Sequence, residues 1–204
     1  MTGQALALPE SERNTTDWEK EHQMSDKTDS GQDDKSRFNS TITSEDVSEL
    51  YLNLKENNIT VWIDGGWCID ALLGRQTRLH QDLDIAVSRK DSTELRCLLE
   101  NIGFSEEPRH DSSEFMYVMK NYAGKRIDVH VFEYDSGGRN IYGIAYPFGS
   151  LSGKGVIDGL EVNCIDPEWM FKFKTSYEPK EKDIHDVRAL SKKFEIEMPE
   201  RYKN

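Results

Sequence analysis

The chain has 204 residues, and its 38 acidic residues outnumber its 26 basic ones to give a formal net charge of -12. A field of this sign repels phosphate backbones, so nucleic acid is disfavoured as a working substrate and a cationic small molecule is compatible. Three cysteines without a CxxC pair predict neither a disulfide framework nor a zinc ribbon, and no apolar run approaches the ~18 residues of a membrane helix.

Residues 1–41 are predicted to form a disordered, polar and acidic tail, because they are nearly free of aliphatic residues after Leu8. Residues 42–204 are expected to form one domain. Its first helix follows a cap-like cluster at 43–46 and carries Val47, Leu50 and Leu54. No signal peptide precedes it, so we expect a soluble cytoplasmic protein, monomeric or homodimeric, without a membrane partner.

The next elements alternate between strands and helices. Residues 60–64 are predicted to form a buried strand that ends at Gly65-Gly66, and residues 67–73 a short helix closed by Gly74. Residues 82–87 alternate like a half-buried strand, and Asp91, three residues before Glu94, resembles the cap of a helix that ends near residue 103. Further strands are expected at 114–120 and 126–134, a hairpin at 156–162, and helices from Asp166-Pro167 and Pro179. This order predicts a mixed α/β (α+β) layout, with helices covering one face of a small sheet.

The sequence Asp82-Leu83-Asp84 carries the sharpest chemical signal. Residues two apart on a strand share a face, so the two carboxylates point together. Such repulsion is relieved by a cation between them, and magnesium is the natural candidate because it takes hard oxygen ligands beside substrate phosphates. A solvated acidic face on an edge strand is the alternative.

A second strand offers a third carboxylate at Asp128, two residues before His130. Placed beside the first strand, Asp128 would complete a three-carboxylate site for two-metal phosphoryl transfer, as a metal ligand, a general base, or both. A structural role is the simpler interpretation of His130.

Gly65 and Gly66 lie between a strand and a helix, where a backbone without Cβ atoms lets phosphate oxygens approach the amides at the helix start. A tight turn alone would ask for the same residues. Arg78 and His80 precede the aspartates as a local basic group that is able to neutralise a triphosphate, as is Lys182 in the last helix. Solvated positions are the alternative for all three.

The stretch from Trp62 to Asp84, WIDGGWCIDALLGRQTRLHQDLD, closely resembles the nucleotidyltransferases that inactivate lincosamide and aminoglycoside antibiotics, including the aminoglycoside 2''-adenylyltransferases. This resemblance implies a polymerase-beta-like nucleotidyltransferase fold with closing C-terminal helices. It places the triphosphate at Gly65 and Gly66, magnesium at Asp82 and Asp84, and the family's third carboxylate at Asp128. Residues 135–155 match the family pattern poorly.

We therefore expect an Mg²⁺-dependent nucleotidyltransferase, with two ions and ATP or another NTP as co-substrate. It would transfer a nucleoside monophosphate to a hydroxyl of a small molecule, an aminoglycoside or a lincosamide. Two alternatives stay open, namely transfer to a protein hydroxyl, as in antitoxin-like members of the superfamily, and a catalytically inactive domain that binds nucleotide or a partner.

Overall fold

The computed structural model describes residues 40–203, and one mixed sheet organises them. The strands follow the order β3-β4-β5-β2-β1-β8-β7, with β6 paired to the outer part of β5. Their bounds are β1 Val61–Ile63, β2 Asp82–Ser88, β3 Phe104–Glu106, β4 Met116–Asn121, β5 Arg126–Tyr134, β6 Asn140–Gly143, β7 Gly153–Ile157 and β8 Leu160–Cys164. The central pairs β2–β5 and β1–β8 are parallel, whereas β1–β2 is antiparallel. The predicted mixed sheet is confirmed, although at eight strands it is not small.

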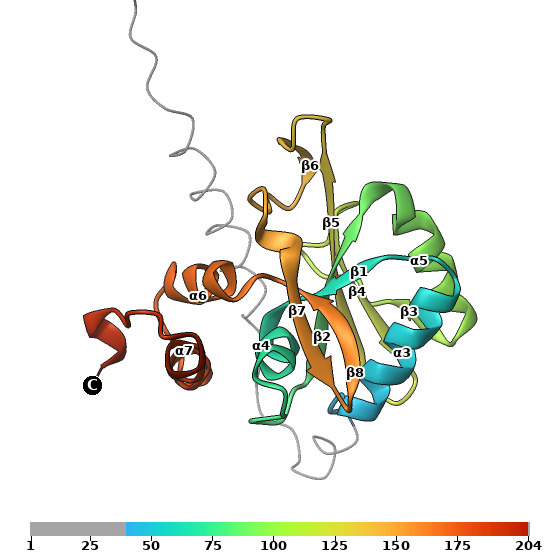
Figure 1. Ribbon diagram of the computed structural model, residues 1–204. Helices are drawn as coiled ribbons and strands as arrows, with labels where there is room; N and C mark the ends of the chain where they lie inside the picture. The colour runs from blue at the N-terminus through green and yellow to red at the C-terminus, as the bar shows by residue number, and fades with distance from the viewer. Residues whose placement is uncertain (1–39, 204) are drawn as a thin grey trace, which may run out of the picture.

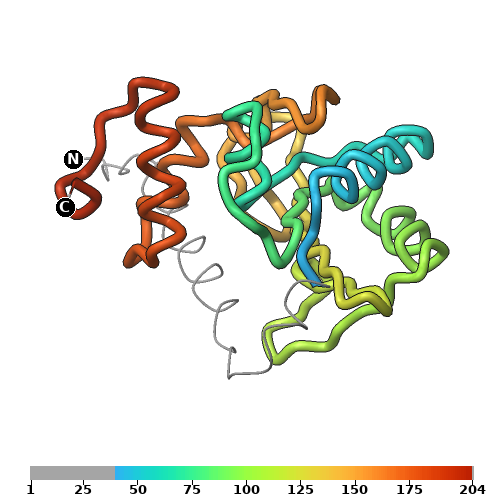
Figure 2. Tube along the Cα trace, turned by 90° about the horizontal axis from the view of Figure 1, so that it is seen from below, coloured from blue at the N-terminus to red at the C-terminus, as the bar shows by residue number. Residues whose placement is uncertain are grey.

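Helices lie on both sides of the sheet (Figures 1 and 2). They are α3 Ser44–Glu56, α4 Gly65–Leu73, α5 Arg89–Asn101, α6 Pro167–Thr175 and α7 Glu181–Phe194. α3 and α5 cover one face, while α4 lies on the other, with α6 and α7 beyond it. The expectation that helices cover a single face is therefore wrong, because the glycine turn places α4 on the aspartate side of the sheet.

Most predicted elements appear near their expected bounds. α3 begins with a capping box in which Thr43 and Asp46 exchange hydrogen bonds, and α4 ends at Gly74 in the left-handed conformation. The cap predicted at Asp91 is wrong, since α5 begins at Arg89 and its N-cap, Ser88, makes no side-chain cap bond. The short strands β3 and β6 were not predicted. The disordered tail predicted for residues 1–41 lies, up to residue 39, outside the described residues.

The core forms where the apolar face of β2 meets α5. Leu83, Ile85 and Val87 are buried, as the alternation of this strand predicts, and Leu95 and Leu99 of α5 are buried with them in the same core. Each side chain of this size contributes roughly 1.5–3 kcal/mol when it leaves water. The polar face of β2 is thereby fixed toward α4.

The β7–β8 hairpin supports α4 from the neighbouring part of the sheet. Asp158 and Gly159 both have positive φ at its two-residue turn, which is the turn that Asp-Gly predicts. Gly155 of β7 faces Ala71 of α4 so closely that a Cβ on Gly155 would come within 2.7 Å of the Ala71 Cβ. The helix therefore rests on strand backbone at this point.

Candidate active site

The glycine turn is built around Asp64, the N-cap of α4. The Gly65 amide donates to Asp64 Oδ1 at 2.6 Å, and the Asp64 amide donates to the carbonyl of Asp84 at 2.9 Å. Gly65 has φ +60°, and a Cβ there would overlap the Asp84 carboxylate. A side chain at this position is thus excluded both by conformation and by space. The turn and the carboxylate are in direct contact.

The three predicted carboxylates come from adjacent parallel strands. Asp84 of β2 is the register partner of Asp128 of β5, and Asp82 lies two residues earlier on the same face as Asp84. Burial, with repulsion from Asp82 and Asp128, raises the pKa of Asp84 to about 8. Burial and the charge of Asp82 likewise raise the pKa of Asp128 to about 6, although Arg109 and His130 oppose this. The group holds more negative charge than its surroundings neutralise.

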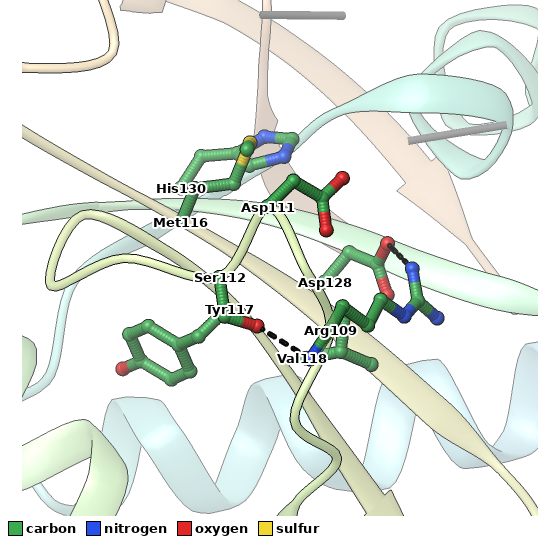
Figure 3. A pocket seen from close by; sticks show the side chains of 8 residues that line it. All are labelled: Arg109, Asp111, Ser112, Met116, Tyr117, Val118, Asp128 and His130. Carbon is green, nitrogen blue, oxygen red and sulfur yellow. Dashed lines mark hydrogen bonds and ion pairs between the residues drawn. The ribbon is translucent and has the colours of Figure 1, made fainter. Parts of the chain in front are cut away.

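Arg109 lies next to Asp128, at the edge of a hollow whose empty volume is about 280 Å³, open solvent included. Its Nη1 atom forms an ion pair with Asp128 Oδ2 at 3.5 Å, as Figure 3 shows. Among the residues that the structure describes, the other oxygen, Asp128 Oδ1, is buried and has no hydrogen-bond partner. The hollow is lined by Arg109, Asp111, Ser112, Met116, Tyr117, Val118, Asp128 and His130.

His130 belongs to a buried polar group that supports the glycine turn. The Tyr146 hydroxyl donates to Asp64 Oδ2 at 2.6 Å and lies 3.2 Å from His130 Nδ1. Burial alone would lower the pKa of His130, but the carboxylates of Asp64, Asp84 and Asp128 raise it above its ordinary value. His130 thus fills the structural role that was its simpler interpretation, and the neighbouring carboxylates favour its protonated form.

Arg78 and His80 lie beneath Gly66, where a Cβ would contact both side chains. His80 is buried, and its Nε2 donates to Asp70 Oδ2 at 2.6 Å. Its Nδ1 accepts from Arg78 Nη1 at 3.0 Å. His80 is therefore engaged with protein groups and positions the backbone of the turn, whereas the side chain of Arg78 is 22% exposed and borders the turn directly.

α7 reaches the same region through a buried charge cluster, which we define as Arg78, Lys174, Asp183 and Asp186. Arg78 binds Asp186 with two hydrogen bonds, Nε to Oδ1 at 3.0 Å and Nη2 to Oδ2 at 2.9 Å. Lys174 Nζ donates to Asp183 Oδ1 at 3.2 Å. Burial opposes the charge of Lys174, but Tyr177 and the carboxylates around it, including that of Asp84, raise its pKa above its ordinary value.

Lys182 lies outside this buried charge cluster. It is in the first turn of α7, and its side chain is exposed. Lys174 of α6 is the lysine whose pKa is raised in part by the charge of Asp84, while the phosphate-binding role of Lys182 stays a prediction.

Replacing Asp186 by asparagine is expected to destabilise the protein by about 3 kcal/mol, because removing one partner of a buried ion pair leaves the other uncompensated. Asp186 is 1% exposed and binds the guanidinium that borders Gly66. Chemical denaturation measures the loss. Asp135→Asn removes the acid of a solvent-screened pair with Arg139 and should change stability far less. Equal effects for the two variants would contradict this role of Asp186.

Several residues of the site were not predicted from sequence. Asp64 carries a detectable signal, because an aspartate directly before Gly-Gly at a strand end is typical of an N-cap. Arg109 and Tyr146 carry none, since each lies in a connecting segment and meets the acids only in the folded chain.

The chain is similar in sequence to known proteins. A family model described as aminoglycoside-2''-adenylyltransferase matches residues 46–190. This chain belongs to that family. Within the adenylyltransferase family, the chain is 27% identical over 158 residues to a lincosamide resistance protein of Staphylococcus haemolyticus, covering 74% of this chain and 96% of that protein. It is also 46% identical over 57 residues to a 2''-aminoglycoside nucleotidyltransferase of Klebsiella pneumoniae, covering 28% and 32% respectively.

Solved structures agree with the family assignment. The lincosamide antibiotic adenylyltransferase LnuA, solved with lincomycin bound, matches with TM-score 0.65 and 22% identity, covering 74% of this chain and 98% of its own. ANT(2'')-Ia, solved with adenylyl-2''-tobramycin, matches with TM-score 0.61 and 25% identity, covering 74% and 88%. The resemblance and the nucleotidyltransferase fold predicted from sequence are therefore confirmed. Within residues 40–203, no helix has the length and apolar character needed to cross a bilayer.

Proposed function

We propose that this chain is an Mg²⁺-dependent nucleotidyltransferase that moves AMP from ATP to a hydroxyl of a small antibiotic, an aminoglycoside or a lincosamide. The observation that carries the proposal is the contact between the glycine turn and a group of three carboxylates from neighbouring strands. Membership of the adenylyltransferase family supports the reaction class. One relative is a lincosamide resistance protein and another is a 2''-aminoglycoside nucleotidyltransferase, which supports an antibiotic of either class as the acceptor.

The carboxylates fit a magnesium ion. Asp82 and Asp84 offer hard oxygen donors and form no ion pair with any residue in the described part of the chain. Ionising Asp84 is unfavourable without a cation, as its raised pKa indicates. Magnesium normally uses one or two carboxylates and completes its shell with phosphates and water. When bound, it supplies charge neutralisation at the triphosphate and a lower pKa for a coordinated hydroxyl.

The remaining roles fall to the chain itself. Gly65 and Gly66 present backbone to the triphosphate, and Arg78 provides positive charge beside the turn. The acceptor hydroxyl oxygen forms a bond to the α-phosphorus, the bond from that phosphorus to the bridging oxygen breaks, and pyrophosphate leaves. The hydroxyl proton passes to a base or a metal-bound site, and Asp128 is the carboxylate available for either role, as base or as third ligand for a second ion.

The experiment is an acceptor screen. Purified protein is incubated with MgCl₂, each of the four common NTPs, and a panel of aminoglycosides and lincosamides, and products are sought by mass spectrometry. An antibiotic heavier by one nucleoside monophosphate supports the proposal. Labelled nucleotide found on protein alone would favour a protein acceptor, and absence of any product with every NTP would favour an inactive nucleotide-binding domain.

A further inference from the structure

The three carboxylates of the site differ in their surroundings. Asp82 and Asp84 make no ion pair within the described residues, whereas Asp128 already has a resident cation, the guanidinium of Arg109 at 3.5 Å from Oδ2. Figure 3 shows this guanidinium beside the Asp128 carboxylate, with a dashed line marking the ion pair. A divalent cation on the same oxygen would face like charge at close range, which is costly in a partly buried site.

Arg109 is held in this position from several sides. Its Nη2 atom pairs with Glu107 Oε2 at 3.5 Å, and its backbone amide donates to Ser112 Oγ at 3.0 Å. Glu107 is itself fixed, because it accepts from Arg126 Nε and from Lys120 Nζ, each at 2.8 Å. Moving the guanidinium away would therefore break ion pairs with both Asp128 and Glu107, and its side chain is only 27% exposed.

Within residues 40–203, no three His, Cys, Asp or Glu side chains lie together closely enough to hold one metal ion. Asp82 and Asp84 suffice for an ion that also takes phosphate oxygens. A second ion would need Asp128. Arg109 stands at its Oδ2 atom, and its Oδ1 atom, which has no hydrogen-bond partner among the described residues, is buried.

We propose that Arg109 is a positioning residue that keeps divalent cations off Asp128 and so reserves this carboxylate for the proton of the acceptor hydroxyl. The inference rests on the proposed function and deepens it. It assigns the metal to Asp82 and Asp84 and excludes a second protein-held ion. In the transfer step, the proton leaves the acceptor oxygen for Asp128 as the new bond to phosphorus forms, while Arg109 remains paired with the carboxyl group.

The test counts bound metal rather than product. Mn²⁺ serves as the probe because it takes the same oxygen ligands as magnesium, and free Mn²⁺ is followed by electron paramagnetic resonance. The full-length protein is titrated with MnCl₂ in the presence of saturating α,β-methylene-ATP, which is not cleaved at the reacting bond. The variants are Arg109→Ala, Arg109→Lys and Asp128→Asn, and the control is Arg139→Ala, whose arginine pairs with Asp135 on the exposed β5–β6 turn.

We expect about one Mn²⁺ per chain for the wild type, Arg139→Ala and Arg109→Lys, and about two for Arg109→Ala. Asp128→Asn should keep the wild-type count, which a metal ligand would not. Two ions in the wild type, an unchanged count in folded Arg109→Ala, or a lost ion in Asp128→Asn would each overturn the inference alone. If Arg109→Ala does not fold, as judged by circular dichroism, the numbers of Mn²⁺ ions bound to the wild type and to Asp128→Asn still test the inference. No bound Mn²⁺ in the wild type would overturn the proposed function itself.

Discussion

Nucleotidyl transfer is expected to fall by on the order of 10³-fold or more when Asp84 is replaced by asparagine, because the variant loses a charged ligand at the point where charge develops. Asp84 is the carboxylate in contact with the glycine turn and the register partner of Asp128. The measurement is the initial rate of product formation with a confirmed acceptor at saturating ATP. Asp91→Asn makes the same chemical change in α5, on the opposite side of the sheet, and should leave the rate within about twofold.

The same variant should gain stability when no divalent cation is present. The pKa of Asp84 rises on folding from an ordinary value of 3.8 to about 8, so ionisation disfavours the folded state. The protonated carboxyl contributes its full stability below the unfolded-state pKa of 3.8. This contribution is lost as pH rises through the folded-state pKa of about 8. In EDTA, the melting temperature of Asp84→Asn should therefore exceed that of the wild type at pH 8 and approach it near pH 4. A lower melting temperature at pH 8 would show that the carboxylate stabilises the apo fold.

Gly65→Ala is expected to cost both activity and stability, whereas Gly74→Ala costs stability alone. The two glycines have similar backbone conformations, φ +60° and +73°, so each alanine variant bears a left-handed residue at about 1–2 kcal/mol. Nothing lies within 4 Å of a Cβ on Gly74, but a Cβ on Gly65 would overlap the Asp84 carboxylate and displace it. A displacement of about 1 Å at a reacting centre costs about 10²-fold in rate.

Paired measurements of thermal melting and initial rate separate the two effects. The difference in rate between the variants, at temperatures where both are folded, reports the displaced carboxylate, because the backbone strain is shared. Equal rates would mean that Asp84 accommodates the methyl group without leaving its working position, and the turn would then have to act in some other way.

The sequence predicted the site best where local rules decide the geometry. The alternation in Asp82–Val87 placed two carboxylates on one face and three aliphatic side chains in the core, and the structure agrees. Asp166-Pro167 and Asp158-Gly159 similarly determined a helix start and a hairpin turn. In each case, neighbouring residues alone set the backbone conformation.

Prediction failed where the structure depends on contacts between residues that are distant in the sequence. β3 and β6 have only three and four residues, too few for a period to be recognised, and they form by pairing with β4 and β5. Arg109 lies in a connection with no helical or strand period, so only the folded chain brings it to Asp128. The role of His80 in neutralising a triphosphate stays a prediction, but its hydrogen bond to Asp70 could not be predicted, because only the folded chain brings the two side chains together.

The position of α4 depends on the backbone of β7 beneath it, and β7 lies outside the sequence motif that forms the site. At Gly155 the strand backbone packs directly against Ala71, so any larger residue would push α4 away from β7 and disturb the helix that follows the glycine turn. The spacing between the glycine turn and the acids is thereby set in part by a hairpin that supplies none of the residues proposed to act in the reaction. A search for inactivating mutations that is limited to the charged residues would therefore miss Gly155.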